Sequence, residues 1–82
     1  MTEQEIMKCE ELMKEAIGVA RQARKEFDYI RQHYLSDDMY KCEMSQRRSD
    51  RHWGQAEGVY RALKRLGYEH DEMITLEKLI NW

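Results

Sequence analysis

Apolar and small residues recur at alternating steps of three and four between Ile6 and Tyr34, and charged residues fall between them. A repeat of about 3.5 residues is typical of a helix that packs along one narrow stripe against another helix. We therefore predict one long helix over residues 3–34. The repeat positions are Ile6, Cys9, Met13, Ala16, Ala20, Ala23, Phe27, Ile30 and Tyr34.

A second stretch repeats the same spacing and predicts a second helix over residues 37–66. The short break at residues 35–38 contains Ser36 as the expected N-cap, and Gly67 is the expected left-handed cap at the other end. A connection this short folds the second helix back antiparallel to the first. The repeat positions are Met39, Cys42, Gln46, Ser49, Trp53, Ala56, Tyr60, Leu63 and Gly67.

A third, short helix is predicted over residues 72–81, with Asp71 as its N-cap. At the start of the chain, Thr2 and Glu5 have the spacing of a capping box. The predicted fold is therefore all-α, with residues 1–82 forming one domain. It is a long antiparallel helical hairpin followed by a short C-terminal helix.

Folding the hairpin at its break places residues opposite each other when their numbers add up to about 72 or 73. Ala23 then faces Ser49, and Ala20 faces Trp53. Cys9 and Cys42 lie ~32 Å apart along the hairpin at 1.5 Å per residue, so we expect both to be reduced thiols.

The open end of the hairpin, away from the connection, carries apolar residues beside the repeat as well as on it. We expect the third helix to cover this wider stripe. The half near the connection has only the narrow stripe, which is barely self-supporting in water. It therefore either projects as a stalk or packs against a second copy or another protein, and we expect a dimeric bundle. The additional apolar residues are Leu12, Ile17, Val19, Val59, Ala62 and Leu66.

Composition limits the classes of function. The 82 residues are 37% charged and contain no Pro, which favours helices. A net charge of −2 gives no overall attraction to nucleic acid or a membrane surface. No apolar run approaches the ~20 residues that span a bilayer, and the acidic N-terminus does not resemble a signal peptide. We expect a cytoplasmic protein.

Basic residues gather at the middle of the predicted hairpin, and we call them the arginine belt: Arg21, Arg24, Lys25, Arg47, Arg48 and Arg51. One interpretation is a solvated face held by ion pairs four residues apart. The other is a partner-binding site for acidic groups or phosphates, because clustered arginines suit both. Tyr29 and Tyr40 lie close enough to join such a site.

Catalytic and metal-binding patterns are weaker. A corner of His33, Asp37 and Cys42 can be drawn, but its spacing matches no established zinc pattern. A thin hairpin also offers little of the concavity that catalysis requires. We predict no metal site, no cofactor, no small-molecule substrate and no enzymatic activity.

The sequence therefore favours a small helical protein–protein interaction module, an adaptor, regulator or inhibitor of a larger protein that acts by surface binding. Its expected partners are another protein and a second copy of itself. The alternative is a protein that binds the phosphate backbone of nucleic acid through the arginine belt. Steep salt dependence of binding would favour the alternative.

Overall fold

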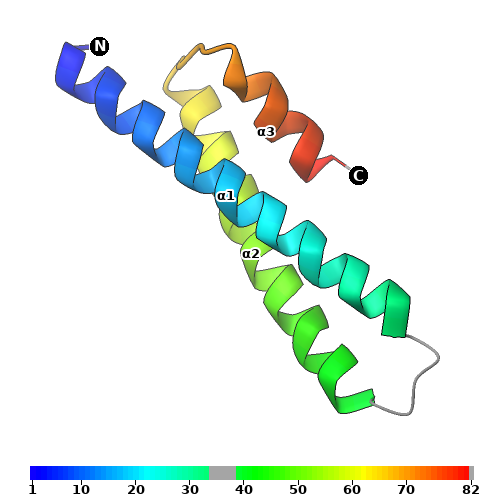
Figure 1. The fold of residues 1–82 in the computed structure, drawn as a ribbon. Helices are drawn as coiled ribbons and strands as arrows, with labels where there is room; N and C mark the ends of the chain where they lie inside the picture. The colour runs from blue at the N-terminus through cyan, green and yellow to red at the C-terminus, as the bar shows by residue number, and fades with distance from the viewer. Residues whose placement is uncertain (34–38, 82) are drawn as a thin grey trace.

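The computed structural model describes the backbone of residues 1–33 and 39–81. It also describes the side chains of these residues, except those of residues 33 and 39–42. These residues form three helices: α1 (Glu3–His33), α2 (Met39–Arg65) and α3 (Glu72–Ile80). The first two make an antiparallel hairpin, and α3 runs beside the open half in the same direction as α1 (Figure 1). The all-α prediction is confirmed. The molecule is elongated, with principal extents of 53 × 17 × 16 Å.

The predicted register is confirmed at the middle of the hairpin. The buried hydroxyl of Ser49 donates a hydrogen bond to the backbone carbonyl of Ala23 at 3.1 Å, which joins the two helices where the sequence places them together. Several of the buried side chains along this interface are small. Trp53 packs on this core while remaining half-buried. The fully or almost fully buried small residues are Ala16, Ala20, Ala23 and Ala56.

The main hydrophobic core lies at the open end, where α3 adds a third layer. Met13 of α1, Leu63 of α2 and Leu76 of α3 are its largest fully buried side chains. Cys9 is buried in the same core as a free thiol, as expected. This arrangement confirms that the third helix covers the open end, and it explains why α3 folds although it is only nine residues long.

Coverage by α3 is nevertheless one-sided, which the sequence did not show. Ile17 lies in the core under α3, whereas Leu12 remains 45% exposed, Leu66 63% exposed and Ala62 exposed. A single short helix can shield only one side of a two-helix hairpin. The opposite side, which we call the bare flank, keeps its apolar residues in solvent.

Two other interface predictions were wrong. Ile6 is 44% exposed because α2 ends at Arg65, so Ile6 lies beyond the last helical turn that could cover it. Gln46 is exposed and donates its amide to Asp50 of the same helix at 3.1 Å. It lies beside the interface and not in it.

The helix ends follow local chemistry with one exception. The Thr2 hydroxyl accepts the Glu5 N–H at 3.2 Å, as the capping box predicts. Gly67 has φ 75°, and the bonds from Gly67 N–H to the Lys64 carbonyl and from Tyr68 N–H to the Leu63 carbonyl, both 3.0 Å, complete a Schellman cap.

The predicted Asp71 cap was wrong. Asp71 adopts helical angles (φ −57°, ψ −36°), whereas an N-cap needs extended ones, and its side chain makes no capping bond. The Glu72 N–H donates instead to Nδ1 of His70 at 3.0 Å. Two further predictions lie outside the described residues: the end of the first helix at Tyr34 and the Ser36 cap.

Candidate functional site

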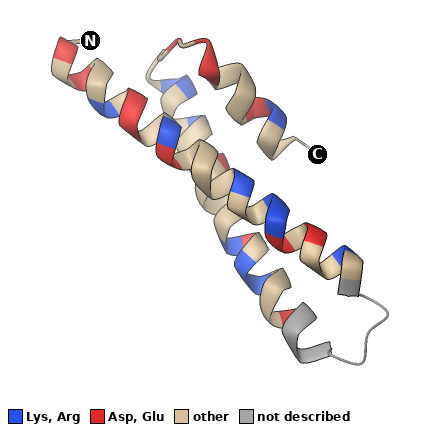
Figure 2. Ribbon diagram, viewed as in Figure 1, with Lys and Arg blue, Asp and Glu red and all other residues tan. Residues whose placement is uncertain are grey.

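The arginine belt forms at the predicted height of the hairpin. The Ala23–Ser49 hydrogen bond lies between its two halves, so Arg21, Arg24 and Lys25 on α1 stand level with the three arginines of α2. Figure 2 shows these basic segments on both helices near the middle of the hairpin. Their directions around the hairpin, however, differ greatly.

Arg24 is a structural residue. Its guanidinium donates to two backbone carbonyls at the end of α3, Lys78 at 2.7 Å and Leu79 at 3.3 Å. These carbonyls lie in the last turn of α3, and the end of a helix carries a partial negative charge. A cation there caps α3 and ties it to α1. Arg24 is half-buried in this contact and therefore belongs to the fold.

Two other members of the belt, Arg21 and Arg47, also lie on another side or are already paired. Arg21 lies on the side of α1 that faces α3, beside Glu72 and Thr75. Arg47 pairs with Glu43 of its own helix at 3.4 Å, both side chains well exposed. Arg51 is exposed. Because Arg24 and Arg21 lie on the side of α3, the six belt residues do not all face one common surface.

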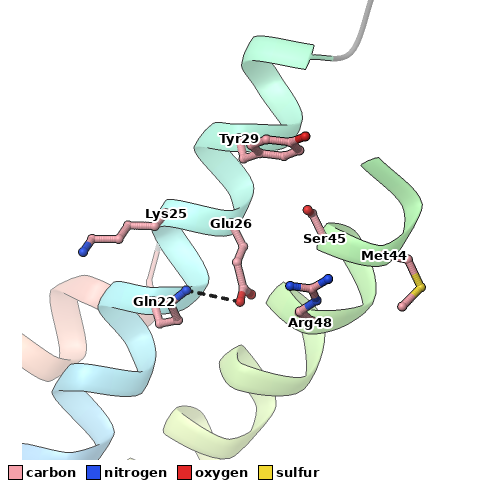
Figure 3. Close-up of a pocket in the computed structure, with 7 residues that line it drawn as sticks. All are labelled: Gln22, Lys25, Glu26, Tyr29, Met44, Ser45 and Arg48. Carbon is pink, nitrogen blue, oxygen red and sulfur yellow. Dashed lines mark hydrogen bonds between the residues drawn. The ribbon is translucent and has the colours of Figure 1, made fainter. Parts of the chain in front are cut away.

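Lys25, Arg48 and Tyr29 are the predicted residues that the structure does bring together. They line a groove between α1 and α2 with a volume of about 540 Å³ (Figure 3). The groove opens on the bare flank. Glu26 on the wall of the groove is two residues away from Arg24, which lies under α3. Two residues turn a helix by about 200°, so the groove lies on the side of α1 opposite to α3. The remaining residues that line the groove are Gln22, Glu26, Met44 and Ser45.

A bridge between the helices fixes the end of the groove nearer the core. The Glu26 carboxylate contacts Nδ1 of His52 at 3.1 Å and accepts the Gln22 side-chain amide at 3.4 Å. Its side chain is only 10% exposed and that of His52 30% exposed. The bridge links α1 to α2 and positions the Glu26 wall, so we assign Glu26 and His52 to the support of the groove.

The two cations of the groove are exposed, and within residues 1–33 and 39–81 neither Lys25 nor Arg48 makes an ion pair or hydrogen bond. Figure 3 shows Arg48 beside the groove and Lys25 extending away from α2. Unpaired cations on a helical surface are ready to bind carboxylates or phosphates. Half-buried Tyr29 and Met44 add an aromatic ring and a flexible thioether.

The predicted set of partner-binding residues did not include five residues of this site: Gln22, Glu26, Met44, Ser45 and His52. The numbers of Glu26 and His52 add up to 78, whereas residues that face each other directly add up to about 72 or 73. The difference arises because side chains beside the interface reach diagonally across it. The predicted member Tyr40 has a side chain outside the described ones, as do His33 and Cys42 of the metal corner, and Asp37 lies outside the described residues.

No cluster of three or more His, Cys, Asp or Glu side chains in the described part of the chain could hold a metal ion. His70 is engaged in accepting the Glu72 N–H, and its ring stacks on Tyr68 with the ring centres 6.1 Å apart.

No helix among the described residues combines the length and apolar character that crossing a membrane requires. Comparison of the chain with protein-family models, with curated proteins and with solved structures finds no match.

Proposed function

We propose that this protein is a small helical protein–protein interaction module, acting as an adaptor, regulator or inhibitor of a larger protein through surface binding. The observation that supports this most strongly is the groove between α1 and α2. It combines unpaired cations with half-buried apolar surface on a flank that α3 leaves open.

The chemistry of the groove favours a partner segment with acidic and apolar side chains. Arg48 offers a planar fork of donors to a carboxylate, and Lys25 adds a second positive charge. Tyr29 and Met44 supply contact area that adapts to the shape of a partner. The groove is shallow and open, which suits a peptide segment or helix better than a small substrate.

The alternative, binding to a nucleic-acid backbone, has weaker support. A duplex laid against one face of the hairpin meets only part of the arginine belt, because Arg24 caps α3 and Arg21 lies on the side facing it. Counterion release makes phosphate binding fall steeply with salt, roughly in proportion to the number of phosphates neutralised. A salt titration therefore separates the two functions.

Position-specific photo-crosslinking in cells tests the proposal and does not require the partner to be identified first. A photoreactive amino acid replaces Ser45 in the groove, and in a matched control it replaces Arg61 on a distant side of α2. We expect discrete protein adducts from position 45 and none from position 61. Arg48→Glu should abolish these adducts, whereas Arg47→Glu, one residue away but paired with Glu43, should retain them.

Two results would contradict the proposal. Equal adducts from both positions would show that the groove has no preference for a partner. Adducts composed of nucleic acid, lost as salt rises, would support the alternative function.

A further inference from the structure

The bare flank carries an apolar strip at the open end, separate from the groove, composed of Leu12, Val19, Val59, Ala62 and Leu66. Leu12 is 45% exposed and Leu66 63% exposed, while Val19 and Val59 are half-buried against the core. Large apolar side chains exposed together on one face indicate an interaction surface.

Helical spacing places this strip in line with the Glu26–His52 bridge. Val19 and Leu12 lie seven and fourteen residues before Glu26, and Val59 and Leu66 lie seven and fourteen residues after His52. Positions seven apart share a side of a helix, so each pair repeats the geometry of the bridge two turns further along. The strip therefore runs along the bare flank from the bridge to the open end.

Charges at the edge of the strip favour a second copy of this chain as its partner. Lys8 and Glu15 flank Leu12 on α1 at the same seven-residue spacing, both are exposed, and neither has an ion pair among the described residues. If two hairpins meet face to face and run in opposite directions, α1 lies against α1 of the other copy. Lys8 of each copy then faces Glu15 of the other, with Leu12 near the two-fold axis.

A two-fold interface must be self-complementary, and this edge satisfies that condition. Hairpins that run in the same direction would instead place α1 against α2 of the other copy at equal heights. Lys25 and Arg48 of both copies would then stand at one level, which gathers four positive charges at the same height and is unfavourable. The charge pattern therefore favours the antiparallel arrangement.

We infer that this protein forms an antiparallel homodimer through the apolar strip of its bare flank, with Lys8 and Glu15 paired reciprocally across the interface. This inference goes beyond the proposed function, because the groove lies outside the overlapped region. The dimer would present one open groove towards each of its two ends.

Light scattering of the full chain under reducing conditions measures the mass directly. We expect about twice the 10.0 kDa of one chain. Leu12→Glu should give a monomer with unchanged helix content, because this side chain is 45% exposed and lies outside the buried core. The matched control is Ile74→Glu on α3, which is 58% exposed away from the strip and should leave the dimer intact.

Charge reversal tests the direction of pairing. Lys8→Glu alone and Glu15→Lys alone should each raise the dimer dissociation constant about 3- to 10-fold, since each affects two equivalent exposed contacts. The double variant should restore it to within about 2-fold of the original. Restoration requires that these two residues meet between copies.

Three outcomes would overturn the inference. A monomer at every concentration would exclude the dimer, while crosslinking from position 45 would still decide the proposed function. A dimer that survives Leu12→Glu would exclude the strip as its interface. A dimer weakened by both single reversals but not restored by the double variant would exclude the antiparallel pairing.

Discussion

Tyr68 lies in an environment unlike that of an ordinary surface tyrosine. It follows the Gly67 cap and turns its ring into the core, where it is only 6% exposed. Its hydroxyl is buried and has no hydrogen-bond partner within the described part of the chain. Burial of a polar group without a partner is unfavourable, so this hydroxyl costs stability.

Replacing Tyr68 with Phe should therefore stabilise the protein by about 1 kcal/mol, because the ring keeps its packing and the unpartnered hydroxyl is removed. Urea unfolding followed by circular dichroism measures the change. A loss of stability would show that the hydroxyl has a favourable interaction in solution.

The same hydroxyl makes the free energy of unfolding depend on pH in the alkaline range. Burial raises the pKa of Tyr68 above the ordinary tyrosine value of 10.0, and the negative charge of Glu10 raises this pKa further, although Lys14 lowers it. Above pH 10 the unfolded chain releases the phenol proton while the folded chain retains it, so the free energy of unfolding falls as pH rises. Below that pH both states hold the proton and the contribution is constant.

Comparing the wild type with Tyr68→Phe isolates this effect from the other groups that titrate in alkali. The difference in free energy of unfolding between the two proteins should be constant up to about pH 9 and then grow in favour of the Phe variant. Unfolding curves between pH 8 and 11 measure it. A difference that does not vary with pH would contradict the burial of the hydroxyl.

Among the elements, α3 depends most on contacts from elsewhere in the chain. It is nine residues long, and isolated helices of that length are unstable in water. Met73, Leu76 and Ile80 anchor it in the core, and Arg24 caps its end. The packing and the cap together hold it against α1.

Arg24→Ala should therefore destabilise the protein by about 1 kcal/mol, since it removes two charge-assisted hydrogen bonds at a partly exposed site. Arg47→Ala is the matched control and should change stability by less than about 0.5 kcal/mol, because its ion pair is exposed. Urea unfolding and amide hydrogen exchange of α3 measure both variants. Equal effects would show that Arg24 is only a surface arginine.

At this scale the sequence predicted the helices and the register well. The three-and-four repeat continues through α1 and α2, so Ala23 and Ser49 could be paired from their numbers alone. The distribution of the arginine belt could not be predicted in the same way. Equal height says nothing about direction around a helix, and Arg24 and Glu26 point to nearly opposite sides although they are close in the chain.

The side of the hairpin that α3 covers also could not be predicted from the sequence. Apolar residues beside the repeat occur on both flanks of the hairpin, so Ile17 and Leu12 are equivalent candidates for burial. The turn at residues 66–71 directs α3 to one of them, and only a three-dimensional path resolves that choice. The groove and the apolar strip both follow from it.

For the whole molecule, elongation and one-sided coverage explain why binding is the proposed function. A rod of 53 × 17 × 16 Å has much surface for its volume, and its core is concentrated in the half that α3 covers. The bare flank then carries two different surfaces along one line. The apolar strip suits a second copy of the chain, and the cationic groove suits an acidic partner.

Both proposals depend on the alignment of α1 with α2, and nuclear Overhauser contacts in the labelled protein test that alignment most directly. We expect cross-peaks between the Ala23 methyl group and the β-protons of Ser49, together with contacts between the side chains of Glu26 and His52. Contacts from the Ala23 methyl group to Ala56 with none to Ser49 would mean a shift by one heptad. Such a shift would remove both the groove and the apolar strip as described.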